Sequence, residues 1–467
     1  MKINPIHLWT LLIAALLIRL LSLGTYPLMD TTEARYGEMA RLMVETGNWL
    51  TPQFDYGVPF WGKPPLFTWM SASGIELLGV NEFAVRMPHW LAGVLVIVLM
   101  AWFARRQGYD ALVTALVLAT CGLFSIAAGA VMTDMALTLG MTLAMLGFYL
   151  CWLGERRWGY IGFVGLAIGL LAKGPVVLVL VGLAVMPWLF LQHGVTGAWR
   201  VLWRRFPLIG GTLLMSAIAL PWYVLAEQAT PGFLDYFIVG EHFKRFVVSG
   251  WQGDLYGSAH DEPRGMIWLF WLASAAPWSV VLPVMYWRKR KHVQIWACEQ
   301  KQLLSFLALW LVSPMLLFTM AGNILPAYVL PGVPALGLLI AMVLRGSRQE
   351  QLWFKVTAGV VPLFLIVAVG YLHFGPSEKR SDKAIWQLTR PGVATFYVGK
   401  RPFSGQFYSH GLARKLASDT PLEQYSRVQL IGKEKEVDHV VAEQKLTCVV
   451  AYAAKSGRAL YQCVKPS

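Results

Sequence analysis

The chain has 467 residues, of which 56% are hydrophobic and 14% are charged, whereas a soluble protein carries about 25% charged residues. This composition excludes a soluble enzyme with a single anchor and predicts an α-helical polytopic membrane protein. Most of the net charge of +14 lies in short loops between apolar runs, so it does not indicate nucleic-acid binding.

Eleven apolar stretches each approach the roughly 20 residues that a membrane-crossing helix needs. They are residues 8–24, 84–103, 111–130, 134–153, 159–175, 176–192, 207–225, 266–287, 302–320, 325–344 and 353–373. We interpret the first as an uncleaved span, because it lacks a small-residue cleavage site. Basic residues such as Arg105, Arg106, Arg204 and Arg205 gather in the loops of one side, which predicts that this side is cytoplasmic. The other side then carries loops 25–83 and 226–265, three short turns and everything after about residue 375.

Loop 25–83 begins with two acids, Asp30 and Glu33, spaced as neighbours on a helix face. They form either a capping box or part of a functional site. A functional site is considered because placing ionisable groups at a membrane face costs free energy. The predicted helix ends before Gly47, and we expect it to lie along the membrane surface. Lys63 stands in a turn made rigid by two prolines. Its side chain either points into a functional site or extends to the lipid headgroups.

Two short turns on the same side carry further charged residues. Asp134 either caps the next helix or faces the same cavity as Asp30 and Lys63. Lys173 ends a predicted span, where Gly174 permits a bend.

In loop 226–265, aromatic residues alternate with basic ones around His242 and Arg245, a pattern that suits a phosphate headgroup. His242 and His260 could equally be ordinary loop histidines. No pair of histidines has ligand spacing, so no metal or other cofactor is required, although a divalent ion remains open. Tyr328 lies in a proline-rich stretch that predicts a broken span, and it either bonds a phosphate or belongs to the interfacial belt.

Residues 376–467 have the composition of a small soluble α/β domain, following a membrane domain over residues 1–375. We predict a helix at 382–389 and strands at 393–398, 427–430, 447–452 and 459–464. A hairpin turn at 454–457 sets Cys448 opposite Cys463, and outside the cytoplasm this pair should form a disulfide. The other three cysteines, Cys121, Cys151 and Cys298, should remain free.

Six motifs then occur in order: Glu33-Ala-Arg35-Tyr36-x-Glu38, Lys63-Pro64-Pro65, Thr133-Asp134, Lys173-Gly174-Pro175, His242-x-x-Arg245 and Leu325-Pro326-x-Tyr328-x-Leu330-Pro331. Together they resemble the family 39 glycosyltransferases over roughly residues 8–340, most of all the bacterial aminoarabinose lipid A transferases and relatives of the dolichyl-phosphate-mannose protein mannosyltransferases.

The resemblance implies a C-type glycosyltransferase fold and a polyprenyl-phosphate-linked sugar, such as an undecaprenyl phosphate sugar, as donor. It implies that an acid of the first loop, Asp30 or Glu33, lies with Asp134 beside the reacting sugar. It also suggests that the donor phosphate is held by Arg35, Tyr36, Lys63, Arg245 and Tyr328. We add Lys173 and His242 to this predicted phosphate-binding set.

Three positions depart from the family pattern. Thr32 stands where an aspartate usually precedes Glu33, so either Asp30 or Glu33 could be the acting acid. Gly62 stands where the aminoarabinose enzymes have a glutamate before the Lys-Pro-Pro turn, which weakens the inference that this chain shares their metal site. Asn323 stands where relatives often have lysine. These departures leave the sugar and the acceptor open.

The predicted function is therefore an inner-membrane glycosyltransferase whose site and C-terminal domain face the periplasm. Its acceptor would be lipid A or lipopolysaccharide, another glycan or a protein. The alternatives are a transporter or flippase of lipid-linked sugars and a non-catalytic scaffold. A transporter usually shows internal repeats and a midplane site, neither of which the sequence indicates.

Overall fold

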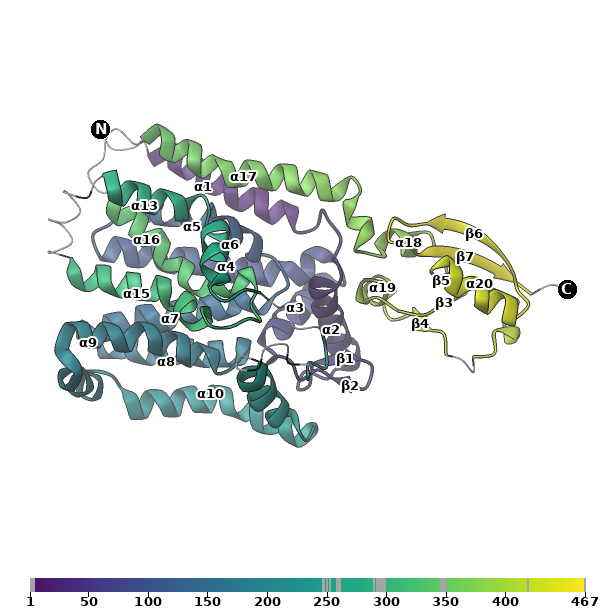
Figure 1. The fold of residues 1–467 in the computed structure, drawn as a ribbon, viewed down its shortest axis with the longest axis horizontal. Helices are drawn as coiled ribbons and strands as arrows, with labels where there is room; N and C mark the ends of the chain where they lie inside the picture. The colour runs from purple at the N-terminus through teal and green to yellow at the C-terminus, as the bar shows by residue number, and fades with distance from the viewer. Residues whose placement is uncertain are drawn as a thin grey trace.

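A computed structural model of the chain describes residues 5–417 and 420–465, apart from 246–247, 249–250, 252, 258–261, 289, 291–299 and 345–350. A long helical body forms one part of the molecule, and a small sheet domain lies at one end of this body (Figure 1). His260, Cys298 and part of the predicted cytoplasmic basic residues fall outside the described residues.

The helices of the body run mostly along its long axis (Figure 1). In chain order they are α1 (Pro5–Ser22), α3 (Leu66–Leu78), α4 (Glu82–Arg106), α5 (Ala111–Ala119), α6 (Gly122–Ala127), α7 (Thr133–Trp152), α8 (Arg156–Lys173), α9 (Val176–Arg205), α10 (Leu208–Ala229), η1 (Asp235–Lys244), α12 (Met266–Ser274), α13 (Trp278–Arg288), α15 (Lys301–Phe318), η2 (Pro326–Gly332), α16 (Val333–Val343) and α17 (Gln351–His373). The first and last of these, α1 and α17, pack side by side along one edge.

Among the described residues, seven helices are long and apolar enough to cross a membrane, and the bent pair α12–α13 would make an eighth. All eleven predicted stretches coincide with helical segments. However, 111–130 is divided into α5 and α6, and 266–287 bends by 91° between α12 and α13. The helical membrane fold is confirmed, and the number of crossings stays a prediction.

Close glycine contacts join α7 to α8. A Cβ atom at Gly140 would lie 2.7 Å from the carbonyl oxygen of Gly165, and one at Gly147 would lie 2.6 Å from that of Trp158. Helices pack this closely in membranes where small residues remove the side chains between them. Because the two helices are antiparallel neighbours, this packing brings the start of α7 next to the end of α8, where Asp134 and Lys173 lie.

The first outer loop forms α2 (Thr32–Thr46), a short hairpin of β1 (Gln53–Asp55) and β2 (Val58–Pro59), and the turn that leads into α3. As predicted, α2 ends at Gly47, which has a left-handed φ of 67°. The predicted capping box is wrong, because Thr31 is the N-cap and no side chain caps the helix. Its position along the membrane surface stays a prediction, since α2 is not among the helices that are long and apolar enough to cross a membrane. Most of α2 is buried between α3 and α19 (Phe403–Tyr408) of the sheet domain.

The proline-rich stretch after α15 breaks the helix as predicted. Residues Pro326–Gly332 form the 3₁₀ helix η2, and α16 continues from Val333. Proline cannot supply an amide hydrogen to an α-helix, which explains the tighter turns. The break positions Tyr328 at the same end of the body as α2.

The C-terminal domain contains a five-stranded sheet in the order β4-β3-β5-β7-β6. The strands are β3 (Ala394–Tyr397), β4 (Arg414–Lys415), β5 (Arg427–Gly432), β6 (Thr447–Ala453) and β7 (Ala459–Val464), with β3 parallel to β4 and β5 and β7 antiparallel to β5 and β6. The helical segments are η3 (Pro376–Lys379), α18 (Lys383–Gln387), α19, η4 (Leu422–Gln424) and α20 (Glu434–Glu443). Four of these strands match the sequence prediction; the two-residue β4 was not predicted.

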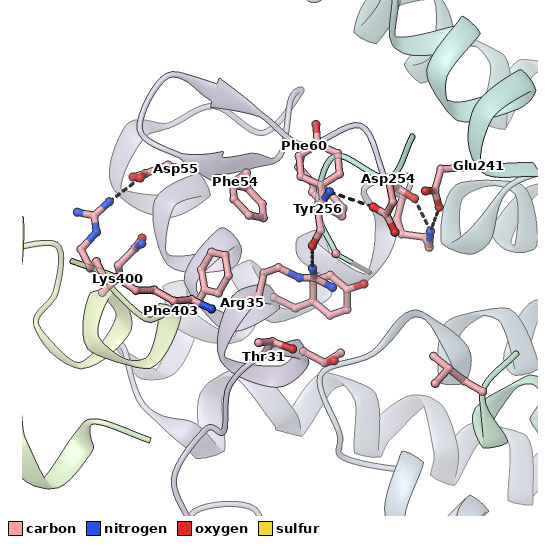
Figure 2. Close-up of a pocket in the computed structure, with 18 of the residues that line it drawn as sticks. Thr31, Arg35, Phe54, Asp55, Phe60, Glu241, Asp254, Tyr256, Lys400 and Phe403 are labelled. Carbon is pink, nitrogen blue, oxygen red and sulfur yellow. Dashed lines mark hydrogen bonds and ion pairs between the residues drawn. The ribbon is translucent and has the colours of Figure 1, made fainter. Parts of the chain in front are cut away.

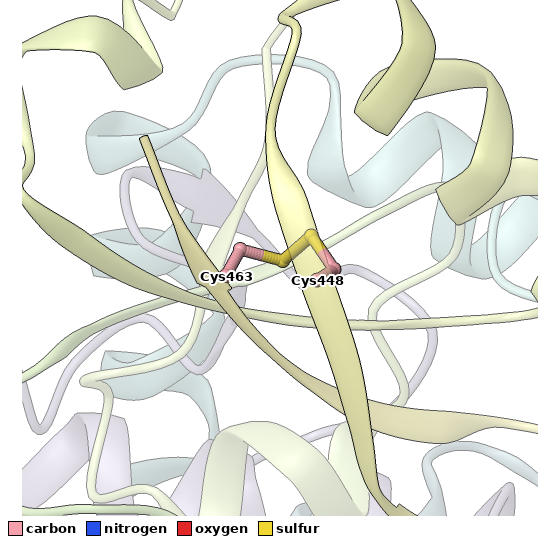
Figure 3. Close-up of a disulfide and its surroundings, with 2 residues drawn as sticks. All are labelled: Cys448 and Cys463. Carbon is pink, nitrogen blue, oxygen red and sulfur yellow. A yellow bond between two sulfur atoms is a disulfide. The ribbon is translucent and has the colours of Figure 1, made fainter. Parts of the chain in front are cut away.

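The hairpin of β6 and β7 places Cys448 directly opposite Cys463, and the two are joined in a disulfide (Figure 3). Gly457, with a φ of 80°, makes the turn between the strands. The bond closes a loop with a sequence separation of 15 residues near the edge of the sheet.

Replacing both cysteines with serine should destabilise the sheet domain by about 3 kcal/mol, because the unfolded chain then regains the entropy of a loop of this length. Hydrogen exchange of the β6 and β7 amides in the intact protein measures this loss. Dithiothreitol should reproduce the loss in the natural protein and have no effect on the double variant. Equal protection of these amides with and without the bond would contradict the prediction.

Candidate active site

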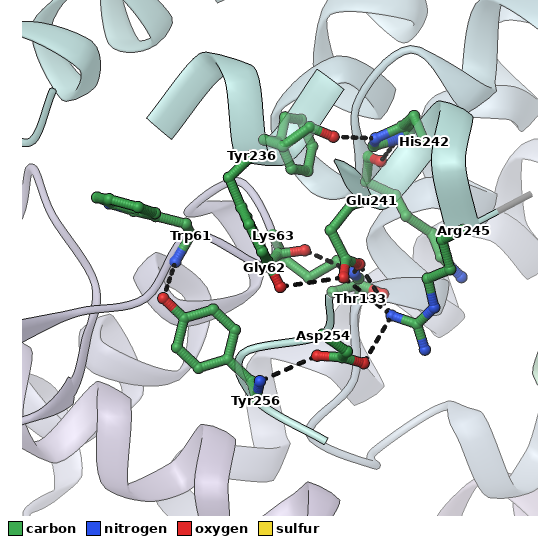
Figure 4. A network of polar contacts seen from close by, with 12 residues as sticks. Trp61, Gly62, Lys63, Thr133, Tyr236, Glu241, His242, Arg245, Asp254 and Tyr256 are labelled. Carbon is green, nitrogen blue, oxygen red and sulfur yellow. Dashed lines mark hydrogen bonds and ion pairs between the residues drawn. The ribbon is translucent and has the colours of Figure 1, made fainter. Parts of the chain in front are cut away.

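Charged side chains from segments distant in sequence meet in one network of polar contacts (Figure 4). This network borders a cavity that residues of the sheet domain also line. Lys63 Nζ lies 2.8 Å from Glu241 Oε2, and Arg245 Nη1 lies 2.9 Å from the same oxygen. Arg245 also lies 3.3 Å from Asp254. Glu241 thus holds two cations from different loops side by side. Burial raises the pKa of Glu241, but the charges of Lys63 and Arg245 outweigh it and hold that pKa below its usual value, so the carboxylate is ionised at neutral pH.

A second ion pair lies beside the first. Lys173 Nζ lies 2.7 Å from Asp134 Oδ1, and both side chains are largely buried. The ammonium group also lies 4.1 Å from the centre of the Tyr328 ring, a cation–π distance. Asp134 therefore fixes the position of Lys173 and leaves its charge directed toward Tyr328.

His242 links the two clusters through the backbone. Its ring nitrogens lie 2.8 Å from the carbonyl oxygen of Phe237 and 3.1 Å from that of Lys173. Burial lowers the pKa of the imidazole, and the contacts with the two carbonyl groups act in the opposite direction. Since both nitrogens face carbonyl groups, His242 holds η1 against the end of α8.

Arg35 points from α2 into an aromatic cluster. Its guanidinium group lies 5.0 Å from the ring centre of Tyr36 and 5.9 Å from that of Phe60, and Nη1 donates to the carbonyl oxygen of Tyr256 at 2.7 Å. Its Nε is buried and has no hydrogen-bond partner among the described residues. No ion pair with a carboxylate is formed by Arg35 in the described part of the chain, so its charge remains available to an anion.

Two cavities meet at these clusters. The larger has a volume of about 610 Å³ and reaches from Lys63 and Arg245 to the sheet domain (Figure 2). The smaller has a volume of about 330 Å³, and its walls include apolar side chains of α9 and α15 such as Val179 and Leu317. Four residues line both cavities: Lys63, Glu241, Arg245 and Tyr328.

All seven residues predicted to hold a phosphate are brought together in these walls. Arg35, Tyr36, Lys63, Arg245 and Tyr328 line the larger cavity, and Lys173 and His242 line the smaller one. Asp134 lines neither and acts on the site through Lys173.

Asp30 and Glu33, the two predicted acids, also lie outside both cavities. Asp30 accepts hydrogen bonds from the backbone amide of Ser404 at 3.1 Å and from its hydroxyl group. Glu33 pairs with the fully buried Arg86, 2.7 Å away. Both acids therefore face structural partners instead of the cavities.

Several cavity residues were not predicted from the sequence. Glu241 stands four residues before Arg245, and this spacing, which allows an ion pair on a helix, is the signal that marks it. Asp254 and Tyr256 lie in an irregular loop, and no pattern marks them. The same holds for Lys400, Arg401 and Lys415 of the sheet domain, which belong to no motif.

The described residues contain no cluster of side chains typical of a protein metal site. Nowhere in them do three or more His, Cys, Asp or Glu side chains gather as ligands. Gly62, which has no side chain, stands directly before Lys63 in the wall of the larger cavity.

Comparison with known proteins gives a consistent result. Residues 8–237 match the family described as dolichyl-phosphate-mannose-protein mannosyltransferase. The undecaprenyl phosphate-alpha-4-amino-4-deoxy-L-arabinose arabinosyl transferase of Enterobacter sp. (strain 638) is 31% identical over 345 residues, which are 71% of this chain and 58% of that protein. Its counterpart in Aeromonas hydrophila is 30% identical over 394 residues, 79% of this chain and 66% of that protein. The chain thus spans about three fifths of the length of the first of these relatives.

Among solved structures, ArnT from Cupriavidus metallidurans with bound undecaprenyl phosphate superimposes with a TM-score of 0.74. The alignment covers 97% of each chain at 21% identity. At this identity the likeness establishes the fold, including the small domain after the helical body.

Proposed function

The chain belongs to the dolichyl-phosphate-mannose-protein mannosyltransferase family, glycosyltransferase family 39, and from this premise we propose that it transfers a sugar from a polyprenyl phosphate carrier to an acceptor outside the cytoplasm. The observation that supports this proposal best is the junction of the two cavities. A donor of this kind has an apolar tail, a phosphate and a sugar, and the smaller cavity offers an apolar wall that ends at Lys63, Lys173 and Arg245.

In this proposal the prenyl chain lies along Val179 and Leu317, and the phosphate lies at the junction. Lys63 and Arg245 then share their hydrogen bonds between Glu241 and the phosphate. Lys173, held by Asp134, supplies a third positive charge. Tyr36 and Tyr328 close the site beside Arg35 and Lys173. Undecaprenyl phosphate is the carrier named for the relatives, and we propose the same class of carrier here.

The transfer step follows from this placement. An oxygen of the acceptor forms a bond to the anomeric carbon while the bond from that carbon to the donor phosphate oxygen breaks, and the electron pair leaves with the phosphate. A phosphate acceptor reacts through an ionised oxygen, whereas a hydroxyl acceptor gives its proton to the released phosphate. Negative charge therefore grows on the phosphate, next to the three cations. Fixed cations aimed at developing charge are an effective source of catalysis because they need no reorganisation.

The acids take different roles in this proposal. Asp134 orients Lys173, and Asp30 and Glu33 hold α2 and the sheet domain in position. Glu241 is the carboxylate at the junction, where the two cavities meet. It keeps Lys63 and Arg245 together in the absence of donor.

We also propose that the site faces the periplasm. The arginines at the end of α4, at the start of α8 and at the end of α9 lie at the opposite end of the body from the sheet domain (Figure 1). By the positive-inside rule that end is cytoplasmic. The disulfide of the sheet domain supports the same orientation, since such bonds persist in oxidising compartments.

The lipid that co-purifies with the protein tests the donor site. We expect mass spectrometry to find a polyprenyl phosphate, with or without its sugar, on the natural protein. Val179→Trp fills the apolar cavity and should reduce the retained lipid about tenfold, which corresponds to about 1.4 kcal/mol of binding free energy. The matched control is Leu178→Trp on the same helix, because Leu178 does not line the cavity.

Bulk phospholipid alone on the natural protein, or equal polyprenyl phosphate on both variants, would reject this donor site. If the lipid carries a sugar, its mass identifies the sugar. Loss of that sugar on adding a membrane extract distinguishes a transferase from a carrier that only moves the lipid.

A further inference from the structure

The sheet domain supplies one whole wall of the larger cavity. Lys400 and Arg401 come from the loop after β3, Phe403 and Gln406 from α19, and Lys415 from β4. Figure 2 shows Lys400 and Phe403 across the cavity from Arg35 of α2. This wall lies away from the apolar cavity, so it faces the part of the site that the donor tail does not use.

Partly buried contacts fix this wall to the helical body. Asp30 accepts from Ser404 at the start of α19, and Arg401 pairs with Asp55 of the hairpin. The hydroxyl group of Tyr408 lies 2.9 Å from Glu82, which Lys383 also contacts at 2.6 Å. The position of the wall is therefore set by the same loop that carries Arg35 and Lys63.

The walls of the larger cavity carry excess positive charge. Among the described residues that line it, six are lysine or arginine and three are carboxylates. The three carboxylates are already paired: Glu241 with Lys63 and Arg245, Asp254 with Arg245, and Asp55 with Arg401.

Three cations remain, and none forms an ion pair with a carboxylate in the described part of the chain: Arg35, Lys400 and Lys415. Two of them belong to the sheet domain and the third lies opposite on α2. Thr31, the N-cap of α2, and Thr32, its first residue, also line the cavity and carry no negative charge. An anion in this space would meet positive charge from both walls.

We propose that the sheet domain forms the acceptor side of the site and that Lys400 and Lys415, with Arg35 opposite, select an acceptor that carries a negatively charged group such as a phosphate. This inference rests on the proposed function, because it takes the other end of the same cavity as the donor end. It gives the sheet domain a role in substrate choice, with Lys400 and Lys415 as specificity-determining residues. Lysine and arginine suit this task because each donates charged hydrogen bonds to phosphate oxygens.

The test compares two double variants of the full-length protein in lipid nanodiscs. Lys400→Ala with Lys415→Ala removes the two cavity lysines. Lys433→Ala with Lys435→Ala removes the same charge from exposed positions of the same domain that do not line the cavity. All four side chains are exposed, so neither variant should lower the unfolding temperature appreciably.

Two probes distinguish the sources of the anionic group. Inorganic pyrophosphate stands for a soluble acceptor, and phosphatidic acid, compared with phosphatidylcholine, stands for one held in the membrane. Binding is followed by native mass spectrometry and by the rise in unfolding temperature with probe concentration. We expect the cavity double variant to bind at least one of the two probes about tenfold more weakly than the control variant.

Equal binding by the two double variants, or no binding of either probe to the natural protein, would overturn the proposal. The co-purified polyprenyl phosphate separates this result from the donor proposal. If the lipid is retained while probe binding does not depend on the two lysines, the proposed donor site is supported and the proposed acceptor side is rejected. If the lipid is absent while probe binding depends on them, the anion site stands and the proposed transferase fails.

Discussion

Replacing Lys63 with alanine should lower the rate of sugar transfer by about 10²- to 10³-fold, the effect of removing one fixed donor from a site of developing charge. Folding should change little, because Arg245 keeps its contacts of 2.9 and 3.1 Å to Glu241 and leaves no buried carboxylate unpaired. The rate is measured as loss of the sugar from the co-purified donor on addition of a membrane extract. The unfolding temperature is measured on the same preparation.

Two further variants make the result specific. Lys379→Ala removes an exposed lysine elsewhere in the outer region and should leave the rate unchanged. Lys63→Arg keeps the charge in a different shape and should recover part of the rate. If Lys63→Ala lowers the unfolding temperature as much as it lowers the rate, or leaves the rate intact, Lys63 does not act on the phosphate.

Replacing Glu33 with glutamine should destabilise the protein by about 3–5 kcal/mol, because it leaves the charge of the fully buried Arg86 without its partner. Arg86 donates to both carboxylate oxygens of Glu33, at 2.8 and 2.7 Å, and to the carbonyl oxygens of Leu23 and Tyr26. It thereby ties the end of α1 to the start of α2. A glutamine side chain carries no negative charge, and its NH₂ group cannot accept a hydrogen bond from this guanidinium group.

The same pair predicts a pH dependence. Burial raises the pKa of Glu33, but the charge of Arg86 outweighs it and holds that pKa below its usual value. The pair therefore stabilises the fold at neutral pH, and this stabilisation is lost as the pH falls through the lowered pKa.

Titration with denaturing detergent, compared with the exposed Glu76→Gln on α3, measures the effect of Glu33→Gln on stability. The folded fraction of the variant should still transfer sugar within a few-fold of the natural rate. A variant of unchanged stability that transfers no sugar would instead make Glu33 the acid beside the reacting carbon.

The contrast between Lys63 and Glu33 shows how far sequence patterns reach. Both residues are charged, lie in the same outer loop and belong to motifs of the family. A charged side chain next to apolar segments costs free energy, which predicts that the residue has a partner. It does not reveal whether that partner is a substrate or another side chain, because the partner comes from a distant part of the chain: Glu241 for Lys63 and Arg86 for Glu33.

The acceptor wall illustrates the same limit more strongly. Lys400 and Lys415 lie in a domain whose sequence carries no motif, and nothing local distinguishes them from other surface lysines such as Lys433 and Lys435. Their place in the cavity depends on how α19 docks on α2, through contacts such as Asp30 with Ser404. Docking of this kind is the sum of many weak interactions between distant segments, and no short pattern encodes it.

The sequence by itself determined the features that depend on local physics. Apolar length and the distribution of arginine predicted the helical membrane body, prolines predicted the break at η2, and the turn at 454–457 predicted the register of Cys448 and Cys463. Only the tertiary structure decided which charges share a cavity. Asp134 meets Lys173 because glycine-lined faces bring α7 against α8, and Asp30 meets Ser404 because the sheet domain folds back onto the first loop. Charge pairing depends on distance in space, which a linear pattern does not contain.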